Sequence, residues 1–283
     1  MTPRRLVAAL ALSVLANPAW AADGQECTPG DLAPVDAWLG QHPWKVGRTG
    51  AEVLVAANCE AWPLDPSIVI VAAAYGRGTV GADGEVDDLH VGDKNFVVAL
   101  VQPHDRKLRS VFAGSVRDDV GWAVNASSLH IDTAPYDLAR SVRAFGVDVS
   151  FNIHTPRCTE AGEGPLRTLF VQDGPSLRPV LVGLPLASWR LVNAPDCGLH
   201  AFPDFDIPIT ESTLRTLALA RHSTQGFADL VVTSETSAVY PEPVRRKRFV
   251  LRYDGSTYRS ADVALWTTFI SSEPEPDAAP RSR

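Results

Sequence analysis

The chain has 283 residues, of which 45% are hydrophobic, and its formal net charge is −7 at pH 7. This length is enough to bury a large core, either in one large all-β domain or in two smaller domains. The acidic balance argues against nucleic acid as a partner and suits a cationic partner better.

The first 21 residues have the features of a secretory signal peptide. Arg4 and Arg5 precede an apolar run at residues 6–16, and Ala-Trp-Ala at residues 19–21 forms a small-residue cleavage site. This run is shorter than the roughly 18 apolar residues that a membrane-spanning helix needs, and no later run is long enough. Cleavage removes two arginines and changes the net charge to about −9. We therefore expect a periplasmic protein that does not span the membrane.

The four cysteines follow the expected cleavage site and predict two disulfides, because an even number of cysteines in an oxidising compartment is typical of a disulfide framework. Of the three possible pairings, we favour the one in which each pair closes a loop within one half of the chain. These pairs are Cys27 with Cys59 and Cys158 with Cys197. One disulfide with two free thiols is the alternative.

A segment rich in Pro, Gly and Trp, residues 22–66, precedes the main fold. Its helical pattern lies at residues 31–44, where apolar side chains share one face. These side chains are Leu32, Val35, Trp38 and Leu39. We expect a short helix that packs on the edge of the main fold.

From residue 67 the chain consists of short apolar or alternating segments separated by turn residues, a pattern that predicts β-strands. In the first half these segments are residues 67–75, 94–101, 108–116, 128–134 and 142–153. In the second half they are residues 166–172, 177–183, 189–193, 213–221, 227–232 and 248–261. Turn residues at 102–107, 173–175 and 222–226 predict three hairpins.

The recurrence of strands without long helical periodicity predicts an all-β fold over residues 67–270. Roughly a dozen or more strands suit an irregular, compact β-propeller-like fold, with a β-sandwich pair as the alternative. The expected N-terminal segment adds one short helix. The tail, residues 271–283, is Pro-rich and charged, and we expect it to be disordered.

No catalytic motif is recognisable, and the sequence therefore predicts a protein that is not an enzyme. It contains no G-x-S-x-G elbow, no H-E-x-x-H motif and no phosphate-binding glycine loop. The seven histidines are scattered singly, as surface or core histidines usually are. His222 and Ser223 are adjacent in a turn, which does not place them as a catalytic dyad. A hydrolase with an unfamiliar site is a third hypothesis.

An acidic loop lies between the segments at 67–75 and 94–101. Its carboxylates, on a loop that contains Gly84, are Asp83, Glu85, Asp87 and Asp88. Closely spaced carboxylates supply the hard oxygen ligands that calcium prefers, but the spacing differs from an EF-hand loop. A solvated acidic loop is the favoured interpretation, and calcium binding in an envelope or structural protein is the alternative function.

A basic run at residues 245–248 precedes the last long strand. We interpret it as an edge strand protected by charge, with contact to an anionic polymer as the alternative.

The second half of the hairpin at 213–232 reads QGFADLVV and has the form G-x-x-D-L-x-V. This form resembles the FG-GAP and VCBS type propeller repeats, and residues 84–92 are a looser match. Acidic residues that hold calcium in such repeats are present in the second match and missing before Gly226. We therefore expect Asp229 to serve the turn.

Together with residues 249–258, this segment also resembles small periplasmic β proteins that include invertebrate-type lysozyme inhibitors and immunity proteins against secreted peptidoglycan hydrolases. The resemblance implies an inhibitor that docks a loop into the cleft of a cationic, lysozyme-like hydrolase. The residues expected to contact the partner are His222, Ser223, Thr224 and Gln225, whose polar groups can hydrogen-bond catalytic carboxylates. An ordinary hairpin turn is the alternative interpretation of these residues.

Overall fold

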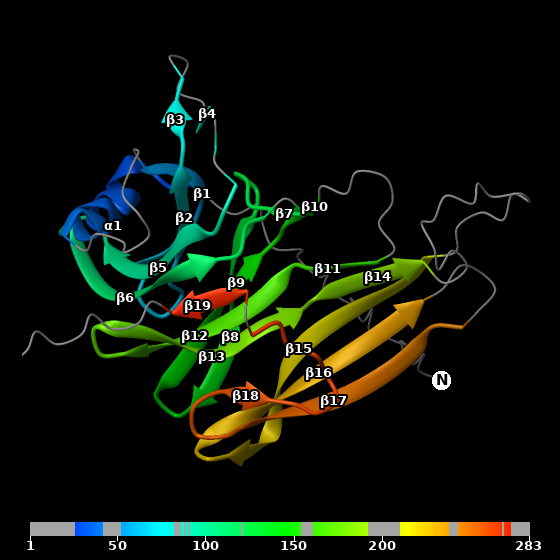
Figure 1. Ribbon diagram of the computed structural model, residues 1–283. Helices are drawn as coiled ribbons and strands as arrows, with labels where there is room; N and C mark the ends of the chain where they lie inside the picture. The colour runs from blue at the N-terminus through cyan, green and yellow to red at the C-terminus, as the bar shows by residue number, and fades with distance from the viewer. Residues whose placement is uncertain are drawn as a thin grey trace, which may run out of the picture.

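The computed structural model describes residues 26–41, 52–81, 86–87, 89, 91–119, 121–153, 161–191, 210–237, 243–267 and 269–272. These residues form one short helix and two large curved sheets, with two small two-stranded sheets beside them (Figure 1). The predicted all-β fold with one N-terminal helix is confirmed. The strands gather in two large sheets rather than in the four-stranded blades of a regular propeller.

The larger sheet is named here the rolled sheet. In spatial order its strands are β1 (Glu52–Ala61), β2 (Val69–Arg77), β5 (Lys94–Gln102), β6 (Lys107–Val116), β13 (Ser176–Pro185), β12 (Leu166–Asp173), β9 (Val142–Val149) and β8 (Leu129–Ala139). Its strands pair antiparallel except β6 and β13, which are parallel, and β19 (Ile270–Ser272) pairs with β6. The sheet curls until its first and last strands meet, where the Ile131 backbone N–H donates to Asn58 Oδ1 at 3.1 Å.

A row of aromatic rings fills the interior of the rolled sheet. The ring centroids of Phe112 and Phe145 lie 5.2 Å and 5.9 Å from that of Phe170. Trp62 extends the row, with its ring centroid 5.4 Å from that of Phe145. Large aromatic side chains bury much apolar area, and this row packs among the aliphatic residues of the same core.

The helix α1 (Pro29–Gln41) covers the outer face of β2 and β5, which explains why these strands are apolar on both faces. Val35 is fully buried in the cluster that contains Val71 and Val97. At the N-terminus of the helix, the Thr28 backbone N–H donates to Asp31 Oδ2 at 2.9 Å, and the Asp31 backbone N–H donates to Thr28 Oγ1 at 3.3 Å in return. This reciprocal cap satisfies backbone groups that the first helical turn leaves without partners.

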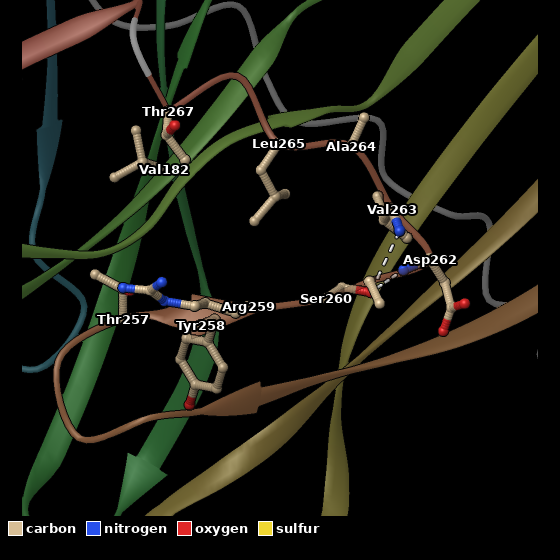
Figure 2. A pocket seen from close by; sticks show the side chains of 11 residues that line it. Val182, Thr257, Tyr258, Arg259, Ser260, Asp262, Val263, Ala264, Leu265 and Thr267 are labelled. Atoms are coloured by element: carbon tan, nitrogen blue, oxygen red, sulfur yellow. Dashed lines mark hydrogen bonds between the residues drawn. The ribbon is translucent and has the colours of Figure 1, made fainter.

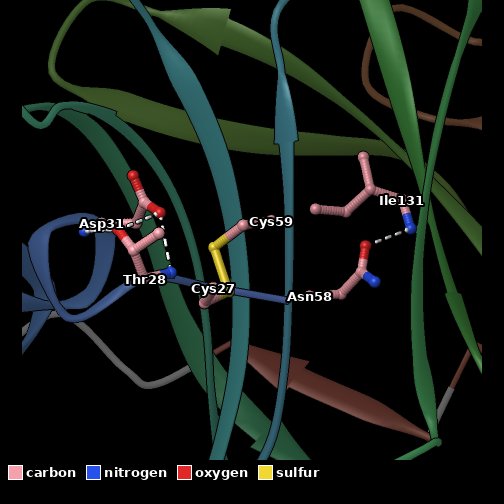
Figure 3. Close-up of a disulfide and its surroundings, with 6 residues drawn as sticks. All are labelled: Cys27, Thr28, Asp31, Asn58, Cys59 and Ile131. Atoms are coloured by element: carbon pink, nitrogen blue, oxygen red, sulfur yellow. Dashed lines mark hydrogen bonds between the residues drawn. A yellow bond between two sulfur atoms is a disulfide. The ribbon is translucent and has the colours of Figure 1, made fainter. Parts of the chain in front are cut away.

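A disulfide joins Cys27, just before the helix, to Cys59 on β1 (Figure 3). The predicted pairing of these two cysteines is confirmed. Cys158 and Cys197 lie outside the described residues. The disulfide and the buried helix face together hold the N-terminal segment on the rolled sheet, where the helix covers a face of the sheet rather than the edge expected from the sequence.

The second sheet contains, in order, β11 (Ala161–Glu163), β14 (Ala187–Leu191), β15 (Thr210–Thr224), β16 (Phe227–Ser237), β17 (Arg245–Tyr253) and β18 (Tyr258–Arg259). The part of this sheet that carries Leu230, Val232 and Leu251 packs on the outer face of β9, β12 and β13, and the other part extends past the rolled sheet (Figure 1). Buried residues of this layer include Leu169, Leu181, Leu230, Val232 and Leu251. The small sheets pair β3 (Thr79–Val80) with β4 (Val86–Asp87) and β7 (Trp122–Ala123) with β10 (Asn152–Ile153).

The three predicted hairpins form as β5–β6, β12–β13 and β15–β16. Residues 52–61, within the segment expected to precede the main fold, are a full strand of the rolled sheet. The expected signal peptide and residues 273–283 of the expected tail lie outside the described residues. Among the described residues, no helix is long and apolar enough to cross a membrane.

Candidate binding site

The β15–β16 hairpin ends in a tight turn at Gln225 and Gly226, whose φ angles are 50° and 87°. Two consecutive residues with positive φ are typical of a type I′ turn, which suits the twist of a two-residue hairpin. His222, Ser223 and Gln225 are exposed, and Thr224 is half-buried. The turn that the sequence predicts is therefore present, and it presents polar side chains to the solvent.

A large β-bulge lies beside this turn. Leu219 pairs with Leu230 and Ser223 pairs with Ala228, so residues 220–222 of β15 stand opposite Asp229 alone. A bulge bends its strand and re-aims the side chains that it carries, and bulges are common next to functional sites. The alternating pattern of residues 213–221 does not reveal it.

A surface cavity of about 780 Å³ adjoins the bulge and is named here the hairpin cavity. Its lining comes from three strands and consists of Leu219, Ala220, Arg221, His222, Ser223, Thr224, Asp229, Val231, Arg248, Val250 and Arg252. Three of the four predicted contact residues line it, and Gln225 does not. The contribution of β17 is not among the residues predicted from the sequence, although Arg248, Val250 and Arg252 alternate along the strand and so share one face.

The hairpin cavity is basic. Arg221, Arg248 and Arg252 line it, and within the described part of the chain none of them forms an ion pair with an acidic side chain. Residues 210–259 hold eight arginine or lysine residues against five acidic residues, although the whole chain carries −7. The negative net charge of the whole chain is therefore not found at this surface.

Asp229 is the one acidic residue of the cavity lining, and its side chain is only 5% exposed. Its Oδ1 atom has no hydrogen-bond partner, and it is the single such buried side-chain atom among the described residues. Burial, together with the charge of the nearby Asp229 carboxylate, raises the pKa of Tyr258 above its usual value. The Tyr258 hydroxyl donates to the Ala228 carbonyl at 2.6 Å. The turn role expected for Asp229 leaves this buried, unpartnered oxygen unexplained.

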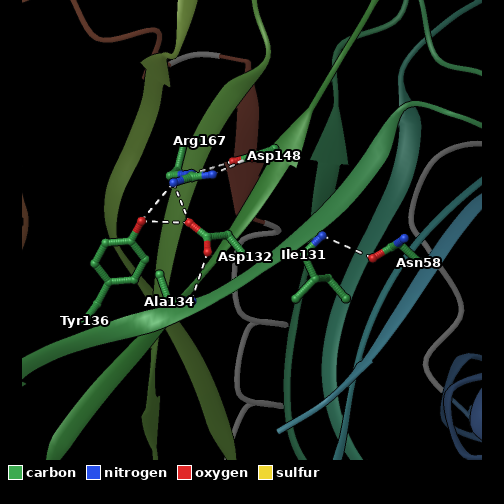
Figure 4. Close-up of polar contacts among 7 residues, drawn as sticks. All are labelled: Asn58, Ile131, Asp132, Ala134, Tyr136, Asp148 and Arg167. Carbon is green, nitrogen blue, oxygen red and sulfur yellow. Dashed lines mark hydrogen bonds and ion pairs between the residues drawn. The ribbon is translucent and has the colours of Figure 1, made fainter. Parts of the chain in front are cut away.

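A second polar cluster lies among β8, β9 and β12 and is fully partnered (Figure 4). Arg167 donates from Nε and Nη2 to the two carboxylate oxygens of Asp148, each at 2.7 Å, and pairs with Asp132. The Tyr136 hydroxyl donates to Asp132 at 2.7 Å and accepts from Arg167. Burial alone lowers the pKa of Arg167, but the hydrogen bonds to Asp148 raise it above its usual value. We interpret this cluster as a structural tie between strands.

Two further cavities lie on the opposite face of the second sheet. The larger, of about 810 Å³, is lined by Val182, residues 257–265 and Thr267, and within this lining the Asp262 and Val263 backbone N–H groups donate to Ser260 Oγ (Figure 2). The smaller, of about 290 Å³, contains Glu211, which pairs with both Arg190 and Arg245. Among the described residues, the acidic and basic side chains that line these two cavities are closer in number than those that line the hairpin cavity.

The predicted calcium ligands fall largely outside the described residues. Asp83, Glu85 and Asp88 lie there, and only the backbone of Asp87 is described, in β4. Within the described ranges, no group of three or more His, Cys, Asp or Glu side chains is placed to hold a metal ion. Calcium binding by the acidic loop stays a prediction.

Comparison with known proteins found no matching family model, no matching curated protein and no matching solved structure. The resemblance to propeller repeats and to periplasmic lysozyme inhibitors therefore stays a prediction. The hairpin cavity is the candidate site because it combines an exposed tip, uncompensated basic side chains and a buried carboxylate without a partner.

Proposed function

We propose that the protein is an exported, non-enzymatic binding protein that inhibits a lysozyme-like peptidoglycan hydrolase through the tip of the β15–β16 hairpin. The observation that carries this proposal is the charge beside the tip. Arg221, Arg248 and Arg252 flank His222 and Ser223 without acidic partners among the described residues.

The chemistry of the target supports this choice of surface. Glycoside hydrolases cleave their substrate between two carboxylic side chains that lie within a cleft. A hairpin tip that brings hydroxyl, imidazole and guanidinium donors can form charge-assisted hydrogen bonds with such carboxylates. The basic character of residues 210–259 thus suits the cleft better than the uncharged tip expected from sequence.

The net charge of the rest of the chain favours association with such a hydrolase. Its acidic excess lies outside residues 210–259, and many lysozyme-like enzymes have a cationic surface around the acidic cleft. Complementary potentials of this kind raise the association rate more than they raise the final affinity. The two regions of opposite charge would orient the hairpin toward the cleft.

A lysis assay tests the proposal. The protein lacking residues 1–21 is mixed with purified muramidases, and the decrease in turbidity of a peptidoglycan suspension is followed. We expect the protein to slow lysis by at least one muramidase, and the double variant His222→Ala/Ser223→Ala to lose most of this effect.

The control is His104→Ala, which removes an exposed histidine from the turn between β5 and β6. It should inhibit like the unchanged protein. Absence of both a complex and protection with every muramidase tested would overturn the proposal.

A further inference from the structure

The hairpin cavity contains a buried acceptor that the fold leaves without a donor. Asp229 Oδ1 has no hydrogen-bond partner, although the residue is only 5% exposed. Burial of a polar atom without a partner is costly, and native proteins seldom retain one without a functional reason. The missing donor is therefore the first clue to a ligand.

The other buried carboxylates among the described residues are satisfied. Asp148 receives two hydrogen bonds from Arg167. Asp118 pairs with Lys94 at 3.3 Å and accepts the Val124 N–H at 2.9 Å. The contrast shows that the fold supplies donors to its structural carboxylates, and Asp229 Oδ1 differs from them.

Neighbouring protein groups do not supply the missing donor. The Tyr258 hydroxyl donates to the Ala228 carbonyl. Arg221, Arg248 and Arg252 line the same cavity and are exposed, but none of them forms a hydrogen bond or ion pair with Asp229. The cavity thus presents one buried acceptor beside three exposed cations, two of which lie on β17.

We propose that the hairpin cavity binds a small organic carboxylate that carries a hydrogen-bond donor close to its carboxylate group. The donor, a hydroxyl or amide N–H, would bond to Asp229 Oδ1, and the carboxylate would pair with Arg248 and Arg252. Arginine suits this second role because its planar fork matches a carboxylate. The inference goes beyond the proposed inhibition, because it requires no protein partner.

Two sources supply this chemistry in a cell envelope. Acidic sugars carry hydroxyls next to a carboxylate, and the C-terminal residue of a peptide carries an amide N–H next to one. The cavity volume of about 780 Å³ lies in the range of small-molecule sites, so either ligand fits by size. Because their shared chemistry is the same, the probes below separate the two sources.

Calorimetric titration with four probes tests the inference. D-glucuronate and N-acetylglycine represent the two sources, D-glucose has donors without a carboxylate, and propionate has a carboxylate without a donor. We expect glucuronate or N-acetylglycine, or both, to bind at least about tenfold more tightly than glucose and propionate. The probe that binds more tightly identifies the source.

Variants separate the two halves of the site. In Asp229→Ala, we expect the affinity for the preferred probe to fall by about tenfold or more, because its donor loses the acceptor. Propionate should bind no more weakly than before, because the variant lacks the carboxylate that would repel it. In Arg248→Gln/Arg252→Gln, all carboxylates should bind more weakly. Lys247→Gln, on the same strand but lining the cavity of the opposite face, is the matched control and should bind like the unchanged protein.

Thermal unfolding without ligand supplies an independent readout. If Asp229 serves a ligand, its replacement by alanine removes an unsatisfied buried acceptor, so the midpoint should rise or stay the same. A structural role for Asp229 predicts a lower midpoint. If Asp229→Ala does not fold, Asp229→Leu, which also lacks a side-chain acceptor, is titrated instead, with the same expectation. Equal affinity for all four probes, or no binding of any probe, would overturn the inference.

Discussion

Removal of the Cys27–Cys59 disulfide should destabilise the protein by an amount that follows from its place in the chain. The two cysteines are separated by 32 positions, and in the oxidised protein the bond restricts the unfolded chain. For a loop of this length, the loop-entropy relation gives a loss of about 3.7 kcal/mol in the free energy of unfolding. This is a large share of the roughly 5–15 kcal/mol that a typical domain has.

The perturbation is the double variant Cys27→Ala/Cys59→Ala, and the measurement is urea unfolding of both proteins. Alanine is chosen because Cys59 is buried and serine would bury a hydroxyl there. Reduction of the unchanged protein is a poorer test, since it would also affect any bond at Cys158 or Cys197. A loss below about 1 kcal/mol would show that the bond does not restrict the unfolded chain as this relation assumes.

Three further predictions concern stability and calcium. Arg167→Met should lower the free energy of unfolding, measured with urea, by about 3–5 kcal/mol, because it leaves the buried Asp148 without its cation. The control Lys107→Met, on the surface, should lower it little. Equal losses in the two variants would contradict the role of Arg167 as a structural tie between strands. Burial, and to a smaller extent the Asp36 carboxylate, raise the pKa of Tyr75 in the folded protein. The neutral Tyr75 side chain therefore contributes its full stability below the pKa of about 10 that tyrosine has in the unfolded chain, and this contribution is lost as the pH rises above that value. Urea unfolding at about pH 9 and about pH 11 should show a smaller alkaline loss in Tyr75→Phe than in the unchanged protein, and identical losses would exclude this cause. Calorimetric titration of calcium should give no binding heat if the acidic loop is only solvated, and saturable heat that disappears in Asp87→Ala would favour the calcium alternative.

Local pattern was enough to predict the strands and the turn of the main hairpin. Residues 213–221 alternate in character, and Gly226 supplies the positive φ that the turn requires. These features depend on neighbours in the chain, so the sequence carries them directly. The same holds for the helix, whose apolar face and first-turn Asp31 are local signals.

Long-range pairing could not be predicted in the same way. The closure of the rolled sheet depends on Asn58 and Ile131, which are 73 positions apart, and a strand pattern does not specify its partner. The parallel contact between Val111 and Ser176 is equally remote. The sequence therefore indicates the position of the long strands after residue 67 better than their order in the sheets.

The candidate site was predicted in part for the same reason. His222, Ser223 and Thr224 were identified from the turn, but the bulge that sets them opposite Asp229 depends on the register between two strands. The burial of Asp229 and its nearness to Arg248 and Arg252 depend on how β15, β16 and β17 assemble. Its position in a G-x-x-D-L-x-V segment suggested a turn residue, and this local interpretation does not explain its unpartnered oxygen.

The role of the basic hairpin surface in partner binding is tested most directly by one titration. A lysozyme-like hydrolase is titrated into the protein lacking residues 1–21, into Arg248→Glu/Arg252→Glu, and into Lys247→Glu, whose substitution lies at the opposite face of the same strand. We expect the unchanged protein and Lys247→Glu to bind with similar affinity and the double variant to bind at least about tenfold more weakly, because like charges then face the acidic cleft. Equal affinity of all three proteins, or no binding by the unchanged protein, would contradict this expectation.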